Sequence, residues 1–312
     1  MNAILSAERK RLADSIQRQR GDEPASVFTP FGSSTGGRNM GDILIAAGRL
    51  SREDAARIAG HQQREKLPFG EAAKVLGLLK QDDIDYALSQ QFDYHYLQPG
   101  QTRISQELVA AFQPFGRMGE HLRALRSQLQ LRWLQPGQLP RAMAIVSPAR
   151  GEGRSFIAAN LAVVFAQQGQ RTLLVDANLR HPRLGALFNT EGKAGLSSLL
   201  ADRSEGDGIQ PVPDLRCLHV LAAGHPPPNP QELLGRAAFG QLLQNAAAQY
   251  DVVLVDTPAT DDCADAELIA VRTGTAMVVA RKNQSSLPAV QQLGRRLQDN
   301  GVAMLGSVLN DA

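Results

Sequence analysis

The stretch SPARGEGRS, residues 147–155, decides the fold of this 312-residue chain. The apolar run 142–146 precedes it and a helical pattern over 155–166 follows it. At such a strand-to-helix turn, backbone N–H groups and the helix N-terminus face an anion. Gly151 and Gly153 allow the backbone to approach phosphate groups closely. The stretch therefore predicts a phosphate-binding loop.

One position departs from the usual P-loop pattern. In that pattern a Lys follows the last glycine and reaches the terminal phosphates, and the next Ser or Thr hydroxyl binds Mg²⁺. Ser155 fits the pattern, whereas Arg154 stands in place of the Lys. Arg pairs with phosphate oxygens, but its fork is bulkier than an ammonium group and has a different shape. We therefore expect nucleotide binding to be retained more readily than full catalytic rate.

Two carboxylates end separate apolar runs, as a nucleotide site requires. Asp176 ends the run 172–176, and Asp256 ends the run 251–256. Open α/β sheets place ligands at the carboxyl ends of their strands, where a P-loop fold needs a second Mg²⁺ ligand. Capping of the following helices is the alternative for each acid taken alone. The pair, together with the loop, predicts a nucleoside triphosphate site.

The apolar runs also predict the architecture around this site. The six expected strands are 142–146, 172–176, 218–222, 251–256, 276–280 and 303–309. Helix-like stretches lie between them, and such alternation indicates βαβ crossovers and a buried parallel sheet. The expected fold is an α/β, doubly wound, mostly parallel sheet of the P-loop NTPase type, preceded by a small all-α repeat domain.

That repeat is an internal sequence similarity ahead of the sheet. At a constant offset, Gly41, Leu44, Gly48, Leu50, Ala55, Ala59 and Gln62 match Gly70, Ala73, Gly77, Leu79, Ile84, Leu88 and Gln91. Each unit predicts a short helix, a glycine turn, a cap near Ser51 or Gln81, and a second helix. The predicted parts are a basic segment and linker at 1–36, the helical repeat at 37–100, and the P-loop domain at 101–312.

The segment from about Arg103 to Ala312 resembles bacterial protein-tyrosine kinases of the polysaccharide chain-length-determinant type. The three elements above correspond to that family's Walker A, A′ and Walker B motifs. The stretch PPPNPQELL at 226–234 is similar to the family's Pro-Pro-Asn-Pro-x-Glu-Leu-Leu segment. A helix that starts after a proline-rich loop explains this stretch equally well. The EpsG-type subgroup resembles this chain in its loop and its short tail.

The resemblance implies a role for each matching residue. Those implied to bind the nucleotide are Gly151, Glu152, Gly153, Arg154, Ser155 and Phe156. Those implied to bind Mg²⁺ are Ser155, Asp176 and Asp256. Those implied in catalysis are Asp176, as acceptor of the tyrosine proton, with Arg154 and Arg180. Glu120, Arg123 and Arg126 are similar to the family's Glu-x-x-Arg-x-x-Arg oligomerisation motif, although a solvated helix face is the simpler explanation of such charges.

Two departures from the family bear on activity. Asn178 stands where the A′ motif has a second aspartate, which leaves Asp176 alone as the base. The tyrosines are Tyr86, Tyr94, Tyr96 and Tyr250, so we expect no autophosphorylation in the family's C-terminal tyrosine cluster.

The resemblance implies an ATP-dependent tyrosine kinase that regulates exopolysaccharide chain length, polymerisation and export. The alternative is a nucleotide-gated oligomeric switch or scaffold that phosphorylates nothing. A positioning ATPase of the chromosome-partitioning type ranks lower, because Ala149 stands where that family has its signature Lys.

The resemblance also implies partners and a location. It implies a homo-oligomer in the cytoplasm, held peripherally at the inner membrane by a membrane activator protein. The repeat pattern Gly-x-x-Leu-x-x-x-Gly resembles the N-terminal domain of type II secretion and pilus-assembly ATPases, some of which bind cyclic di-GMP. Asn39 and Pro68 stand where the binding members have Arg. This difference favours a protein-docking domain, with cyclic di-GMP as a candidate ligand.

Composition limits the classes of partner and the cellular locations that we expect. The chain has 33 basic and 31 acidic residues, a net charge of +2, so bulk charge favours neither nucleic acid nor anionic membrane. Cys217 and Cys263 lack metal-ligand spacing, which indicates a reducing compartment. No apolar stretch reaches transmembrane length, and residues 1–20 are too charged for a secretory signal. We expect no nucleic-acid partner and no direct membrane span.

Overall fold

The computed structural model describes residues 39–91, 97, 100–135, 141–190, 194–203, 206 and 208–311. The predicted N-terminal segment 1–36, together with Tyr94 and Tyr96, lies outside the described residues. Within the described ranges, no helix combines the length and the apolar content that a membrane span needs.

Four helices follow the predicted repeat. They are α2 (Met40–Ala46), α3 (Arg52–Glu65), α4 (Phe69–Val75) and α5 (Gln81–Gln91). Gly48 and Gly77 follow the two short helices with φ of +69° and +66°, a conformation that glycine adopts readily. Both units contribute to one buried apolar cluster: Ile43, Leu44, Leu50, Ile58, Ala72, Ala73, Leu79, Ile84 and Ala87. The predicted helices and turns are confirmed, whereas the domain boundaries stay predictions.

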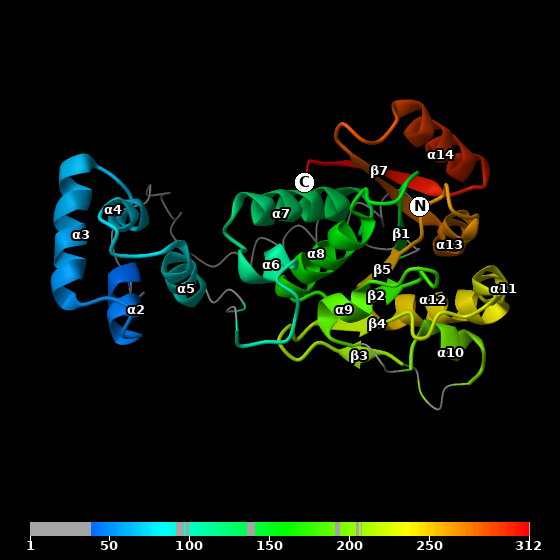
Figure 1. Cartoon of the computed structure of the whole chain (residues 1–312), viewed down its shortest axis with the longest axis horizontal. Coiled ribbons are helices and arrows are strands. Elements are labelled where there is room, and N and C mark those ends of the chain that lie inside the picture. The colour runs from blue at the N-terminus through cyan, green and yellow to red at the C-terminus, as the bar shows by residue number, and fades with distance from the viewer. Residues whose placement is uncertain are drawn as a thin grey trace, which may run out of the picture. The chain divides into compact units, whose positions relative to one another are not determined.

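The part of the structure from Ala142 onward contains a seven-stranded sheet (Figure 1). Its strands are β1 (Ala142–Val146), β2 (Thr172–Asp176), β3 (Gln210–Pro211), β4 (Leu218–Leu221), β5 (Val252–Asp256), β6 (Thr275–Arg281) and β7 (Ala303–Asn310). Their order is β3-β4-β2-β5-β1-β6-β7, and every neighbouring pair is parallel except β3 with β4. The doubly wound fold and all six predicted strands are confirmed.

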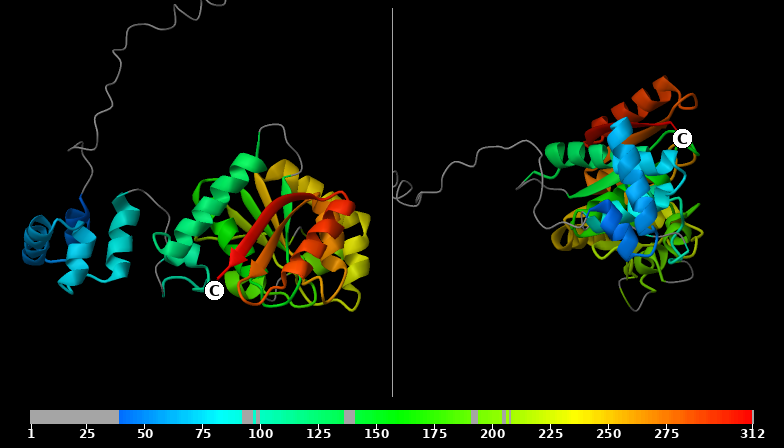
Figure 2. Two further views of the ribbon diagram at one scale, coloured as in Figure 1. Left: turned by 90° about the horizontal axis from the view of Figure 1, so that it is seen from above. Right: turned by 90° about the vertical axis from the view of Figure 1, so that its left-hand side faces the viewer.

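Helices cover both faces of this sheet (Figure 2). The first face packs against α6 (Val109–Phe112), α7 (Arg117–Arg132), α8 (Arg154–Gln167) and α9 (Leu184–Phe188). The second face packs against α10 (Leu196–Leu200), α11 (Pro230–Gly235), α12 (Ala237–Gln249), α13 (Asp265–Thr273) and α14 (Leu287–Asp299). Alternate residues of each central strand enter the two cores, as the pleat requires.

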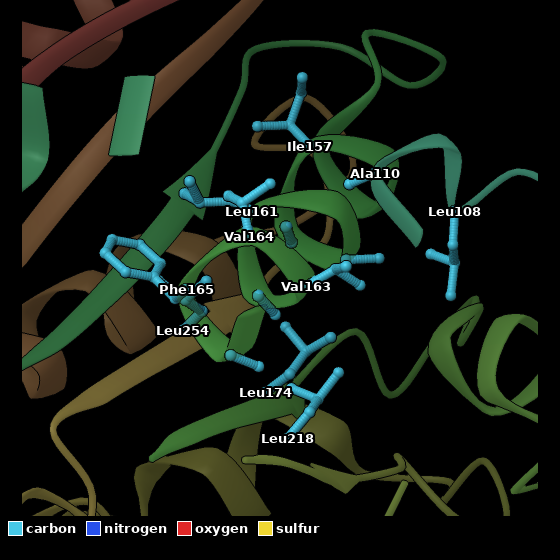
Figure 3. Packing of buried hydrophobic residues seen from close by; sticks show 14 of the residues in the cluster. Leu108, Ala110, Ile157, Leu161, Val163, Val164, Phe165, Leu174, Leu218 and Leu254 are labelled. Atoms are coloured by element: carbon cyan, nitrogen blue, oxygen red, sulfur yellow. The ribbon is translucent and has the colours of Figure 1, made fainter. Parts of the chain in front are cut away.

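Helix α8 is largely apolar around its circumference, as expected of a helix that packs on the sheet and on the helices α6 and α7. Figure 3 shows its side chains Leu161 and Phe165 in this core. Leu161 and Phe165 are fully buried, and so is one polar residue, Asn160. The Oδ1 atom of Asn160 accepts a hydrogen bond from Ala110 N at 2.9 Å, and its Nδ2 atom donates to Glu107 O at 3.1 Å. Asn160 therefore fixes the chain before α7 onto the helix that carries the phosphate loop.

We predict that Asn160→Ala lowers the free energy of unfolding by about 2 kcal/mol, because a buried N–H group loses its acceptor. Urea denaturation measures this change. Asn245→Ala, on the exposed face of α12, is the matched control and should change the free energy by less than about 0.5 kcal/mol. Equal changes in the free energy of unfolding for the two substitutions would contradict the role of Asn160 in joining α8 to the segment before α7.

Candidate nucleotide site

The predicted phosphate loop runs from the end of β1 to the start of α8. Gly151 and Gly153 have φ of +77° and +96°, in the left-handed region that favours glycine. A Cβ atom at Gly153 would also lie only 2.2 Å from Asn310 Nδ2. Because α8 begins at Arg154, its unpaired N–H groups and the positive end of its dipole lie at the loop. The backbone is therefore shaped to bind an anion.

A pocket of about 200 Å³ lies beside this loop at the carboxyl edge of the sheet. The loop supplies Arg150, Gly151, Gly153, Arg154 and Ser155 to its wall. The segments after β2 and β5 supply Asn178, His181, Arg183, Pro258, Ala259 and Asp262. Two predicted nucleotide-binding residues are not part of this wall, because Glu152 is buried and Phe156 packs against the first core.

Ser155 and Asp256 meet as the motifs predict. Ser155 Oγ donates a hydrogen bond to Asp256 Oδ2 at 2.5 Å. Asp256 is fully buried, and its Oδ1 atom has no hydrogen-bond partner among the described residues. Burial raises the pKa of this carboxyl group, because the charged form loses its hydration. A hydroxyl and a carboxylate with a free oxygen are ligands that suit Mg²⁺, so the pair fits the predicted metal.

Asp176 ends β2 directly beside Asp256 in the strand register. Its Oδ1 atom accepts a hydrogen bond from Asn178 N at 3.2 Å, and its Oδ2 atom accepts from Arg183 N and Leu184 N at 3.0 and 2.9 Å. Burial, and then the charge of Asp256, raise the pKa of Asp176. The carboxylate thus shapes the turn that follows β2 and does not line the pocket. Its predicted role as proton acceptor stays a prediction.

Arg154 is held inside the loop and is only 9% exposed. Its Nε atom donates to Thr257 O at 3.0 Å, and its Nη1 atom donates to Ala149 O at 2.7 Å and to Ser147 Oγ. Burial lowers the pKa of the guanidinium group, while the nearby Asp256 acts in the opposite direction. Arg154 therefore brings positive charge to the pocket wall while it binds carbonyl groups of the protein.

Arg180 is not part of the pocket wall. Its Nε and Nη2 atoms donate to the buried carboxylate of Asp265, at 2.8 and 3.3 Å, at the start of α13. This bidentate pair joins the segment after β2 to the segment after β5. The predicted assisting role of Arg180 in catalysis gains no support from this position and stays a prediction.

The predicted oligomerisation residues all lie on α7. Arg123 donates to the carboxylate of Glu120, and Arg126 Nη1 donates to Val164 O of α8 at 2.8 Å. Glu120 keeps 70% of its side chain exposed. The three residues therefore lie on one helix as predicted, and the subunit contact itself stays a prediction.

Sequence reasoning missed the charged mouth of the pocket. Arg150 Nε donates to Asp262 Oδ2 at 2.5 Å, and Arg150 Nη2 lies 2.7 Å from His181 Nε2. Arg183, also on the wall, forms an ion pair with Glu107. The available signal was the acidic pair at 261–262, in the segment that follows the strand ending in Asp256. No spacing rule links it to Arg150, which lies more than a hundred residues earlier.

The buried acids predict a pH dependence of stability without nucleotide. Because burial raises the pKa of Asp256, the folded chain binds this proton more tightly than the unfolded chain does. Its contribution to stability is then lost as pH rises from the unfolded towards the folded pKa. The free energy of unfolding of Asp256→Asn, relative to that of the unchanged chain, should therefore increase as pH rises from about 4 to about 7. Urea denaturation across this range tests it, and a stability difference that is constant with pH would contradict it.

No family model matches the chain. The tyrosine-protein kinase YwqD of Bacillus subtilis (strain 168) is 32% identical over 209 residues, which are 67% of this chain and 87% of that protein. The putative tyrosine-protein kinase EpsB of Ralstonia nicotianae is 36% identical over 231 residues, which are 73% of this chain. The chain spans 29% of the length of that second relative.

A solved structure agrees with these relatives. The kinase domain of the Escherichia coli tyrosine kinase ETK matches with a TM-score of 0.64 and 33% identity, over 69% of this chain and 84% of that domain. None of the comparisons supports the predicted resemblance of the helical repeat to secretion ATPases, or its candidate ligand cyclic di-GMP, and both stay predictions. With YwqD matched over most of its length, the chain belongs to the bacterial tyrosine-protein kinases.

Proposed function

We propose that this chain is an ATP- and Mg²⁺-dependent protein-tyrosine kinase that regulates exopolysaccharide chain length, polymerisation and export. The observation that carries the proposal is the hydrogen bond between Ser155, on the pocket wall, and the buried Asp256, beside a loop whose backbone is shaped for phosphates. Family membership adds the reaction class, because the relatives are tyrosine-protein kinases.

Different groups of the site bind the phosphates and the metal ion of the nucleotide. The N–H groups of the loop and of the first turn of α8 bind the phosphates, and Arg154 contributes positive charge. Ser155 and Asp256 would hold Mg²⁺, which neutralises charge on the phosphate groups during transfer. The loop thus orients the terminal phosphate towards the open pocket, where an acceptor tyrosine enters.

Two carboxylates are candidates for taking the proton from the acceptor tyrosine. Asp176 matches the family motif, and its raised pKa suits a proton acceptor. It is buried and already accepts three backbone N–H groups, so the turn 177–184 has to open before tyrosine reaches it. Asp262 is favoured by position, because it is one of the residues of the pocket wall. Asp176 is the first candidate, and substitution of each aspartate distinguishes the two.

The proposed partners follow from the family. We propose an inner-membrane chain-length activator, homo-oligomerisation through α7, and a cytoplasmic position held at the membrane by the activator. On α7, Arg126 binds α8 of its own subunit, whereas Glu120 is largely exposed. Glu120 is therefore the residue of the motif best placed to meet a neighbouring subunit.

The proposal is tested by incubating the full chain with radiolabelled ATP and Mg²⁺, with and without the cytoplasmic segment of the activator. We expect label on tyrosine that Asp256→Asn lowers at least about a hundredfold, because phosphate and metal are no longer held for transfer. Asp176→Asn and Asp262→Asn, with the neighbouring Asp261→Asn as control, identify the proton acceptor.

The contrary outcome is equally specific. ATP binding without label on the chain, on the activator segment or on a tyrosine copolymer would contradict a kinase. It would leave the nucleotide-gated oligomeric switch, which the replacements at Arg154 and Asn178 also permit.

A further inference from the structure

The phosphate loop is held from outside by side chains that do not line the pocket. Three consecutive carbonyl groups of the loop, those of residues 150–152, accept hydrogen bonds from this outer side. Gln284 Nε2 donates to the first at 3.5 Å, Arg281 Nη1 to the second at 3.1 Å, and Asn310 Nδ2 to the third at 3.2 Å. Arg281 is the last residue of β6, Gln284 lies between β6 and α14, and Asn310 is the last residue of β7.

Glu152 adds a buried carboxylate to this outer side. It is 1% exposed, its Oε2 atom accepts a hydrogen bond from Ala149 N at 2.8 Å, and its Oε1 atom accepts one from Ser285 Oγ. Ser285 Oγ in turn accepts a hydrogen bond from Arg281 N at 2.7 Å. The carboxylate, which would repel a phosphate in the pocket, is thus turned away and used to close the loop on itself.

These contacts bear on anion binding because a peptide unit is rigid. When a carbonyl group is fixed outward, the N–H group of the same peptide unit is fixed in the opposite direction. The positive φ of Gly151 and Gly153 permits this arrangement. The hydrogen bond to Glu152 O is buried, so this carbonyl group needs a donor from the protein. Asn310 supplies one donor and also fills the space that a Cβ atom at residue 153 would need. Loop shape and outer contacts therefore depend on each other.

We propose that Arg281, Ser285 and Asn310, hereafter the outer brace, are positioning residues for nucleotide binding. They hold the phosphate loop with its N–H groups towards the phosphates of a nucleoside di- or triphosphate. The inference deepens the proposed function and rests on its nucleotide site, although not on phosphate transfer. The brace also makes nucleotide affinity sensitive to the segment 281–285 and to the end of β7, both outside the pocket wall.

The test measures the dissociation constant of a fluorescent ADP analogue with Mg²⁺ on the full chain. Ser285→Ala and Asn310→Ala should each weaken binding about three- to tenfold, because one hydrogen bond to the loop is lost. The matched control is Ser286→Ala, since Ser286 directly precedes α14, is exposed and makes no capping hydrogen bond with its side chain. Ser285→Thr keeps the hydroxyl group and should restore binding to within about twofold.

Further variants separate a folding defect from a loss of positioning. Asn310→Asp keeps the side-chain volume and removes the Nδ2 donor, so it should weaken binding at least as much as Asn310→Ala. Circular dichroism without nucleotide verifies that each variant is folded. A dissociation constant for Ser285→Ala and Asn310→Asp equal to that of Ser286→Ala would overturn the inference.

The result is independent of the kinase assay. Weaker ADP binding by the brace variants supports the inference whether or not the unchanged chain labels tyrosine. Absence of tyrosine label overturns the proposed kinase alone.

Discussion

The proposed nucleotide site depends on one structural feature, the carboxylate of Asp256, which is buried at the carboxyl end of the central strand β5. β5 lies between β2 and β1, so Asp256 has Asp176 in register on one side and Ile145 of β1, shortly before the phosphate loop, on the other. Ser155, on the first turn of α8, reaches Asp256 because the loop 147–153 leads from the end of β1 into that helix. The strand order therefore brings together residues from three segments that are distant in the chain.

This arrangement is costly without a ligand, and the two apolar cores offset the cost. Two neighbouring buried carboxylates and a buried guanidinium group lose hydration, which raises the pKa of both acids and lowers that of Arg154. Around them, each of the strands β1, β2 and β5 has all five of its residues buried. Helix α8 packs on the sheet and on the helices α6 and α7. The surrounding structure thus holds charged groups in positions that a metal ion and phosphates would stabilise.

Local sequence patterns predicted the sheet and the residues at the centre of the site, Ser155 and Asp256. They did not predict contacts between residues that are distant in the chain. Apolar runs and glycine spacing are properties of neighbouring residues, so the six strands, the loop and the helix–turn units were accessible from sequence. β3 escaped prediction because Gln210 and Pro211 carry no strand pattern and join only the edge of the sheet. The burial of Arg154, the Arg180–Asp265 pair, the charged mouth and the contacts of Glu152 each join residues brought together by the fold alone.

The central claim is that Ser155 and Asp256 form a Mg²⁺-dependent nucleotide site, and calorimetric titration with ATP tests it most directly. The affinity for ATP is measured with and without Mg²⁺ for the unchanged chain and for Ser155→Ala. The account predicts that Mg²⁺ strengthens binding to the unchanged chain, and that Ser155→Ala loses this gain while it keeps the metal-free affinity. An equal gain from Mg²⁺ in both proteins would contradict the account.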